Sequence, residues 1–338
     1  MTHYLLHFSL LTIIFQSSLV YAEVKPLRLH LSYYPTVASA GVYIAQERGW
    51  YKDAGLDLQL VFKDLNISQN LIDDIADVAI HSGHEIIRQV AMGHDLKAFA
   101  VEYQRNPLSL AANASIKKLS DLKGKTIGLF TDQEKDFIRV MFASEGMSLD
   151  QIHFKKIHSF TVNDLLGFLK TKKYDAIPVW AFNHPVAFAL KGYNTQQYPS
   201  YRYGFHFYGT AYYAKTATIQ NRKEELAKLV HITRRGWMEA FKNPEKTAKE
   251  FMSKWYPKDQ LIDNNYDLTL KQQIIQMKLI QGYLYEGVSP NGFGEMTPFQ
   301  WRTSLKLAIR DKLISNKNIK VDDIFTDDVM KLVREMKP

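Results

Sequence analysis

The sequence predicts an α/β protein of two lobes, in which each lobe is a mostly parallel sheet flanked by helices. Short apolar strands alternate along the chain with helical segments of about ten residues, a pattern typical of parallel, doubly wound sheets. This alternation runs twice, before and after a polar break near residues 119–128. The chain of 338 residues is also longer than one hydrophobic core usually supports. Two lobes imply a cleft between them, and a cleft implies a ligand.

The segment from Leu119 to Gly128 is expected to carry the chain from the first lobe to the second. A helical turn at residues 120–122 is followed by Gly124 and by a new apolar run that starts at Thr126. One folding unit therefore ends here and another begins. We expect two hinge crossings, near residues 110–125 and 205–210, with a first lobe at residues 23–112 and 208–338 and a second lobe at residues 113–207.

The strands and helices of both lobes are predicted from the spacing of apolar residues and from helix-start signals. The pattern Thr131-Asp132-Gln133-Glu134 is a capping box, and proline at the first helical position marks starts at Asn243-Pro244 and Thr297-Pro298. In the first lobe we predict strands at residues 27–31, 56–62, 77–81 and 96–101, and helices at 39–48, at 68–75 and before Met92. In the second lobe we predict strands at residues 126–130, 153–157 and 175–180, helices after Thr131, Thr161 and Asn183, and an extended return at 205–213. From residue 223 the chain is expected to be mainly helical.

Residues 1–22 are expected to be a signal peptide that is cleaved after Ala22. The segment has no Lys, Arg, Asp or Glu, carries an apolar run at residues 10–15, and ends in the small-x-Ala pattern Val20-Tyr21-Ala22. His7 and Gln16 interrupt what would need to be about 20 consecutive apolar residues in a membrane-spanning anchor. We therefore expect export of the mature chain.

The composition excludes several kinds of chemistry. The sequence has no cysteine, which rules out disulfides, thiolate metal sites, a cysteine nucleophile and a lipid-modified cysteine. The formal net charge is +8, but lysine pairs such as Lys117-Lys118 stand beside apolar runs, as solvated edges of elements do. Because there is no basic helix and no RNA-binding motif, no nucleic-acid partner is expected, and the basic surface better suits a partner at a membrane.

The sequence also lacks the scaffolds of common enzyme chemistry. It contains no Gly-x-Ser-x-Gly elbow, no complete phosphate-binding loop and no two-glycine dinucleotide fingerprint. His81, His84 and Glu85 stand close together, but they straddle a predicted strand end, and no third ligand has suitable spacing for a metal. We therefore assign no catalytic residue, no metal site and no cofactor.

Candidate ligand-binding residues follow the predicted strands, since ligands of open α/β sheets bind beyond the carboxyl ends of the strands. These residues combine aromatic rings with neutral hydrogen-bonding groups, which suits a flat, roughly neutral ring such as a pyrimidine. Any single ring could equally fill the core of a lobe. Trp180 and Tyr103 are the strongest candidates. The full set is Tyr33, Tyr34, Ser82, His84, Tyr103, Gln104, Thr131, Trp180, Asn183 and Tyr208.

Several stretches between roughly residues 27 and 255 together carry a resemblance to one family. They are Ala40-Gly41-Val42-Tyr43-Ile44-Ala45, Gly49-Trp50-Tyr51, Ala54-Gly55-Leu56, Asp121 to Gly128, Asp175-Ala176, Phe205 to Gly209 and Trp237 to Pro244. They resemble the NMT1/THI5-like and SsuA-like family of periplasmic substrate-binding proteins, in which Asp121 to Gly128 corresponds to the "DLKGKxIG" segment. This resemblance implies a two-lobed type II periplasmic-binding-protein fold, with a ligand clamped between the lobes and delivered to an ABC permease in the inner membrane.

On this basis we expect a monomeric, periplasmic solute-binding protein of an ABC importer that closes around a pyrimidine-like thiamine precursor. Sulfonate and nitrate binders share the same scaffold, so a binder of that type is an alternative. A ligand sensor for a membrane signalling protein is another alternative.

One branch of the family is an enzyme, the thiamine pyrimidine synthase. The resemblance implies that its lysine-bound pyridoxal phosphate, its sacrificed histidine and its cysteine-rich segment would fall at His81, at Glu85 and near Gly204 to Gly209. An imidazole cannot form the lysine aldimine, and the chain has no cysteine. We therefore expect a binding protein and no enzyme.

Overall fold

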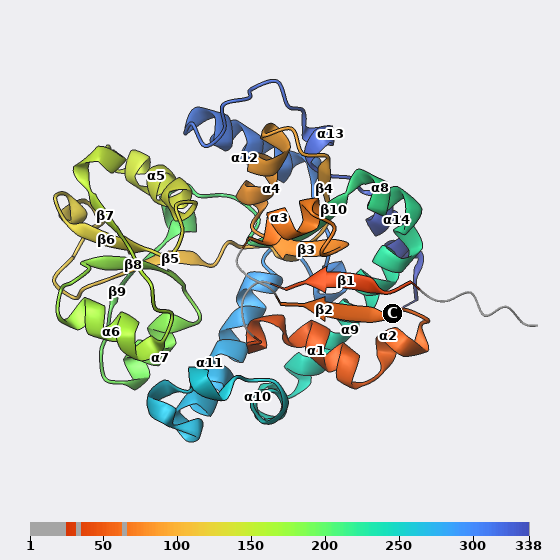
Figure 1. The fold of residues 1–338 in the computed structure, drawn as a ribbon, viewed down its shortest axis with the longest axis horizontal. Coiled ribbons are helices and arrows are strands. Elements are labelled where there is room, and N and C mark those ends of the chain that lie inside the picture. Colours follow the sequence, from red (N-terminus) through yellow and green to blue (C-terminus); the bar gives the residue numbers. More distant parts are fainter. Residues whose placement is uncertain (1–24, 32–34, 63–65, 338) are drawn as a thin grey trace, which may run out of the picture.

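The computed structural model describes residues 25–31, 35–62 and 66–337 and consists of two lobes side by side (Figure 1). Each lobe is built around a five-stranded sheet with helices packed on it. The expected signal peptide and two candidate site residues, Tyr33 and Tyr34, lie outside the described residues. Within the described ranges, no helix combines the length and the apolar character that a membrane crossing requires.

The first sheet has the strand order β2-β1-β3-β10-β4. Strands β1, β2 and β3 run parallel, whereas β10 lies antiparallel between β3 and β4. Its strands are β1 Leu27–His30, β2 Leu58–Val61, β3 Val78–His81, β4 Leu96–Tyr103 and β10 Thr210–Lys215. The parallel part confirms the alternating pattern of the sequence, and β10 is the strand that returns from the second lobe.

The second sheet repeats this plan with the order β7-β6-β8-β5-β9. Here β5 is the antiparallel strand, between β8 and β9, while β6 pairs in parallel with β7 and β8. Its strands are β5 Leu108–Ala112, β6 Thr126–Leu129, β7 His153–Lys156, β8 Ala176–Trp180 and β9 Gln196–Pro199. Each lobe thus receives one antiparallel strand from a crossing of the chain, which makes both sheets mixed but mostly parallel.

The first crossing lies earlier in the chain than the hinge predicted at residues 110–125. Strand β4 of the first sheet ends at Tyr103, and β5 of the second sheet begins at Leu108. Residues 108–112 therefore belong to the second sheet, and the segment from Leu119 to Gly128 lies inside the second lobe. Leu119 and Leu122 of this segment are buried, which explains why a turn that looked like a boundary is part of a packed unit. The chain returns between residues 204 and 209.

Helices cover both sheets, and several begin at the signals read from the sequence. Helices α10 and α12 begin at Pro244 and Pro298, and the preceding Asn243 and Thr297 side chains accept hydrogen bonds from backbone N–H groups of the first turn. The helices are α1 Ala40–Glu47, α2 Trp50–Asp53, α3 Ile67–Ile72, α4 Gly83–Ala91, α5 Glu134–Ser144, α6 Val162–Lys170, α7 His184–Leu190, α8 Thr216–Asn221, α9 Lys223–Lys242, α10 Pro244–Lys254, α11 Tyr266–Leu284, α12 Pro298–Arg310, α13 Val321–Ile324 and α14 Asp328–Glu335.

The C-terminal helices connect the two lobes as well as covering the first one. Helix α9 packs along α1, and α14 packs on α9 and β4. Helix α11, in contrast, contacts α7 of the second lobe as well as α10 and the 3-10 turn Val37–Ser39 of the first lobe (Figure 1). The largest buried hydrophobic cluster likewise includes residues of both lobes. The lobes are therefore in contact in this structure.

Candidate ligand site between the lobes

Four aromatic rings meet where the two sheets face each other. Tyr103 is the last residue of β4, and Trp180 is the last residue of β8. Their ring centroids lie 6.0 Å apart in an edge-to-face arrangement. Phe182 lies 5.7 Å from Tyr103 and 5.4 Å from Trp180, and it also packs on Tyr283 of α11 at 5.2 Å. The structure thus brings together Tyr103 and Trp180, the two strongest candidates, and adds Phe182 and Tyr283, which are not among the predicted site residues.

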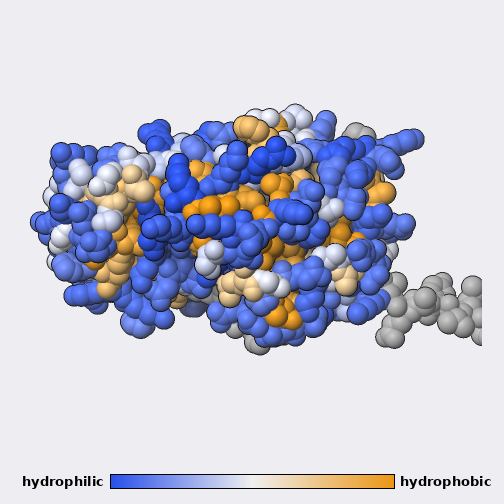
Figure 2. Space-filling view, turned by 90° about the horizontal axis from the view of Figure 1, so that it is seen from above, coloured by the Kyte–Doolittle hydropathy of each residue, from blue (hydrophilic) through white to orange (hydrophobic). Residues whose placement is uncertain are grey.

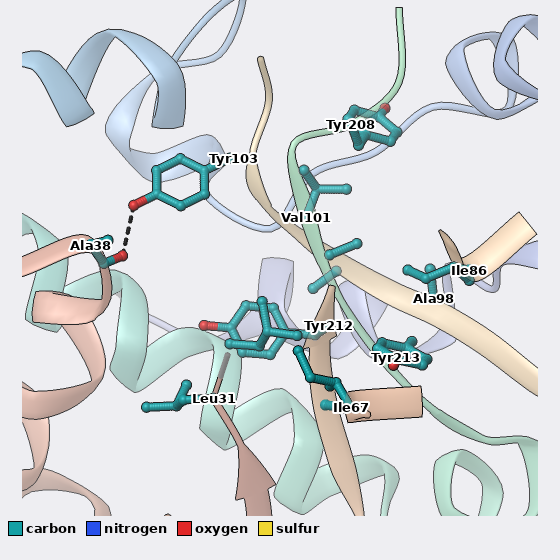
Figure 3. Packing of buried hydrophobic residues seen from close by; sticks show 14 of the residues in the cluster. Leu31, Ala38, Ile67, Ile86, Ala98, Val101, Tyr103, Tyr208, Tyr212 and Tyr213 are labelled. Atoms are coloured by element: carbon teal, nitrogen blue, oxygen red, sulfur yellow. Dashed lines mark hydrogen bonds between the residues drawn. The ribbon is translucent and has the colours of Figure 1, made fainter. Parts of the chain in front are cut away.

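Tyr103 of the ring cluster also makes a hydrogen bond inside the first lobe. The Tyr103 hydroxyl donates to the carbonyl oxygen of Ala38 at 2.6 Å (Figure 3), and burial raises the pKa of Tyr103 well above its usual value. Tyr103 and Phe182 are buried, whereas Trp180 is half-buried. The two-lobed pattern of the sequence predicts a cleft at this position. In the described residues the rings of the two lobes touch, so this part of the boundary is a packed seam.

Asn183 joins the seam through neutral amides of α11. Its side-chain oxygen accepts a 2.8 Å hydrogen bond from Nε2 of Gln272. Gln273 Nε2 donates to Gln272 Oε1 at 3.2 Å, and the backbone N–H of Val37 donates to Gln273 Oε1 at 3.3 Å. These amides form a continuous chain from the first lobe, across α11, to the loop after β8. They give the seam polar groups that carry no charge.

Ser82 and His84 form a second, separate cluster at the start of α4. Ser82 Oγ lies 2.7 Å from His84 Nδ1 and accepts a 3.1 Å hydrogen bond from Asn106 Nδ2. The His84 ring packs edge-on against Phe205 at 5.1 Å, and burial lowers the pKa of His84 to about 3. The histidine is therefore neutral at pH 7. Since β3 and β4 flank β10 in the sheet, this cluster lies roughly 10 Å from the end of β4.

Three predicted site residues have partners outside the ring cluster. Gln104 Nε2 donates to the carbonyl of Glu295 at 2.8 Å, and Thr131 lies in the turn that leads to α5, where its N–H donates to Glu134 Oε2 at 3.3 Å. The Tyr208 hydroxyl accepts a hydrogen bond from the backbone N–H of Thr297 at 3.0 Å, and its ring packs on Trp301 at 5.2 Å. Figure 3 shows Tyr208 apart from Tyr103.

One arginine near each of the two clusters is paired with a carboxylate. Arg105 is bonded to Glu286, and its guanidinium lies over the Tyr283 ring at 5.8 Å. Arg88 pairs with Glu85 at 2.6 Å. Burial alone would raise the pKa of Glu85, but His81 and Arg88 outweigh it and lower the pKa. Among the residues that the structure describes, no group of three or more His, Cys, Asp or Glu side chains is arranged to hold a metal ion.

The outer surface is a weaker candidate for the ligand site than the seam. On the face seen in Figure 2, polar side chains cover most of the surface, and apolar atoms show mainly in the recesses between them. Two hollows lie on the first lobe, one beside Lys97 and Arg334 and the other beside Gln46 and Leu58. Neither is lined by the ring cluster, so the residues after the strand ends remain the better candidate site.

Comparison with known proteins identifies the family. A family model described as NMT1/THI5-like matches residues 36–247, which is more than half of the chain. The chain belongs to the NMT1/THI5-like family. This family member is 25% identical over 272 residues to the riboflavin-binding protein RibY of Chloroflexus aurantiacus, a match that covers 75% of this chain and 72% of RibY.

Solved structures show that this NMT1/THI5-like protein has the two-lobed periplasmic-binding-protein fold. The nitrate-binding protein NrtA of Synechocystis PCC 6803 superposes with a TM-score of 0.68 at 13% identity, over 93% of this chain and 89% of NrtA. The aliphatic sulphonate-binding protein SsuA of Escherichia coli gives a TM-score of 0.60 at 15% identity, over 88% and 91% of the two chains. The fold and family expected from the sequence are confirmed.

Proposed function

We propose that the protein is a periplasmic solute-binding protein of an ABC importer that clamps a small, flat heteroaromatic ligand between its two lobes. The observation that carries this proposal is the meeting of Tyr103 from the first lobe with Trp180 and Phe182 from the second. A flat ring inserted among these side chains would gain stacking contacts from both lobes at once. Such a ligand would stabilise the closed arrangement because it binds that arrangement better than an open one.

The polar groups around the rings favour a neutral ring over a small anion. They are the amides of Asn183, Gln272 and Gln273, and the neighbouring Arg105 is already paired with Glu286. Nitrate and sulfonate are named for structural neighbours that share only the fold at 13% and 15% identity. The curated relative named for riboflavin binding supports a planar heterocycle, and a thiamine-precursor pyrimidine is the smaller member of the same chemical class.

A thermal-shift and tryptophan-fluorescence screen tests this proposal. We expect riboflavin or 4-amino-5-hydroxymethyl-2-methylpyrimidine to raise the melting temperature, since a ligand at 100 times its Kd adds about 2.7 kcal/mol to the free energy of unfolding. Nitrate and an alkanesulfonate should leave it unchanged. Trp180→Leu should weaken binding of the ring about 10-fold through lost stacking and burial.

The matched control is Phe299→Ala, which removes an aromatic side chain that is 76% exposed and belongs to α12. This variant should bind the ring as the unmodified protein does. A melting temperature that responds only to the anions would show that the aromatic-ring proposal is wrong.

A further inference from the structure

The inner face of α11 carries a polar side chain whose hydrogen-bonding capacity the protein does not use. Gln276 is fully buried, at 0% exposure, yet neither its Nε2 nor its Oε1 has a hydrogen-bond partner among the described residues. A buried donor or acceptor without a partner is costly, and most are satisfied in folded proteins. The neighbouring Gln272 and Gln273 are paired, so Gln276 differs from them in keeping both amide atoms free.

The helix geometry points Gln276 at the seam. At 100° per residue, Gln272, Gln276 and Tyr283 fall within about 40° of one another on α11. Gln272 contacts Asn183, and Tyr283 contacts Phe182, so the loop after β8 runs along this face. Gln276 is about 6 Å along the helix axis from Gln272 and about 10 Å from Tyr283. It therefore lies on the same face of α11 between these two contacts, beside the ring cluster.

We infer that Gln276 reads one edge of the bound ring, an inference that rests on the function proposed above and narrows its ligand class. A side-chain amide presents one acceptor and one donor in a single plane. Its complement is a ring edge that carries an adjacent donor and acceptor, as the imide edge of a flavin or the amino-ring-nitrogen edge of a 4-aminopyrimidine does. Nitrate and sulfonate offer acceptors only and would leave the Gln276 oxygen unpaired.

If Gln276 binds this edge, the protein should discriminate between ligands that differ there. A site built to hydrogen-bond a ligand rejects an analogue that lacks the group, because its own buried polar atoms are then left unpaired. The N3-methyl form of riboflavin and the 4-dimethylamino form of the pyrimidine lack the donor but keep the ring. Each should bind roughly 10- to 100-fold more weakly than its parent.

The experiment measures the Kd of both parents and both methylated analogues for the unmodified protein, for Gln276→Leu and for Gln281→Leu. In Gln276→Leu the parent that binds should lose roughly 10- to 100-fold in affinity, and the parent-to-analogue ratio should fall towards 1. The ligand-free variant should melt at a higher temperature than the unmodified protein, since an unpaired buried amide is replaced by an apolar group. Gln281 is exposed on the same helix, so Gln281→Leu should keep both the affinity and the ratio.

Two results would overturn the inference, and they differ in whether the proposed function also fails. If a parent ring binds and the ratio is the same in Gln276→Leu as in the unmodified protein, Gln276 does not read the edge, and the ring-clamping function stands. If neither parent binds the unmodified protein, the proposed function fails and this inference fails with it.

Discussion

Glu102 is a carboxyl group buried in the first lobe, directly before the ring residue Tyr103. It is 3% exposed and accepts hydrogen bonds from Trp237 Nε1 at 3.2 Å and from the Thr210 hydroxyl at 3.3 Å. Burial raises the pKa of Glu102 from 4.5 to about 7, although both hydrogen bonds oppose the shift. The folded state therefore holds the proton more tightly than the unfolded chain does.

This shift predicts a specific dependence of stability on pH. Because the pKa is raised in the folded state, the contribution of Glu102 is complete below pH 4.5 and is lost as the pH rises to about 7. The loss amounts to roughly 3 kcal/mol. Glu102→Gln cannot titrate, so its free energy of unfolding should exceed that of the unmodified protein by roughly this amount at pH 8 and match it near pH 4.5.

Urea unfolding of both proteins at several pH values measures the difference directly. Other buried groups, such as Glu134 with a pKa raised to about 8 by burial, titrate alike in both proteins and cancel. Curves that stay parallel from pH 4.5 to pH 8 would mean that Glu102 ionises normally in the folded protein.

The seam contains some residues that could be predicted from the sequence and others that could not. Trp180 and Tyr103 were predictable because each stands at the end of an apolar strand. Gln276 was not, since the polar run Lys271-Gln272-Gln273 reads as solvent-facing until the packing of α11 between the lobes is known. Three glutamines at helical spacing within a segment rich in isoleucine and leucine are the only signal that the sequence offers. The contact of the Tyr208 ring with Trp301 could not be predicted either, because the two residues are distant in sequence.

At the scale of elements, the contact between α1 and α9 depends on two glycines that face each other. A Cβ on Gly236 would overlap the carbonyl oxygen of Gly41 and would lie 3.1 Å from Cβ of Ala45. A Cβ on Gly41 would run into the Trp237 ring. The backbones of the two helices approach so closely that no side chain fits at this point, which holds Trp237 against Glu102.

Gly236→Ala should therefore destabilise the protein, although alanine is the better helix former. Overpacking costs about 1–3 kcal/mol, which outweighs a gain in helix propensity of at most about 1 kcal/mol. The control is Gly167→Ala in α6, where a Cβ would meet nothing within 4 Å and the free energy of unfolding should rise by about 0.5–1 kcal/mol. Chemical denaturation measures both, and a rise of equal size in the two variants would refute the close approach of α1 and α9.

Some strands could be predicted from the sequence, and others could not. Strands β1, β2, β3, β4, β6, β7 and β8 appear within a few residues of their predicted ranges. Most of them are apolar or alternating runs bounded by turn signals, although β7 is the polar segment His153–Lys156. Strand β9 is Gln196–Pro199, a polar edge strand that ends in proline, and such a segment has no strand pattern of its own. Strand β5 was missed because its antiparallel place between β8 and β9 depends on partners far along the chain.

At the scale of the whole molecule, the two lobes are joined by the two crossings and also by the segment before α11. The turn Ile262–Asn264 reaches the second lobe, where Asp263 accepts a 2.6 Å ion-paired hydrogen bond from Lys191 at the end of α7. Lys191 also donates to Asn163 Oδ1 at 2.7 Å. Asp263 and Asn264 have φ values of 51° and 54°, a left-handed conformation that Asp and Asn adopt more readily than most residues. The turn thus extends a carboxylate to the second lobe without a glycine.

Breaking this ion pair should shift the protein towards an open arrangement. A partly exposed pair is worth about 0.2–1 kcal/mol, so Lys191→Gln should weaken binding of the ring up to about fivefold and increase the radius of gyration of the ligand-free protein in X-ray scattering. High salt should reproduce part of the effect in the unmodified protein, since Asp263 is 47% exposed. Lys242→Gln is the control, because Lys242 pairs with Glu239 three residues away on the same helix and bridges no lobes. If both variants scatter and bind alike, the Lys191–Asp263 pair does not hold the lobes together, and closure depends on the aromatic seam and the amides of α11.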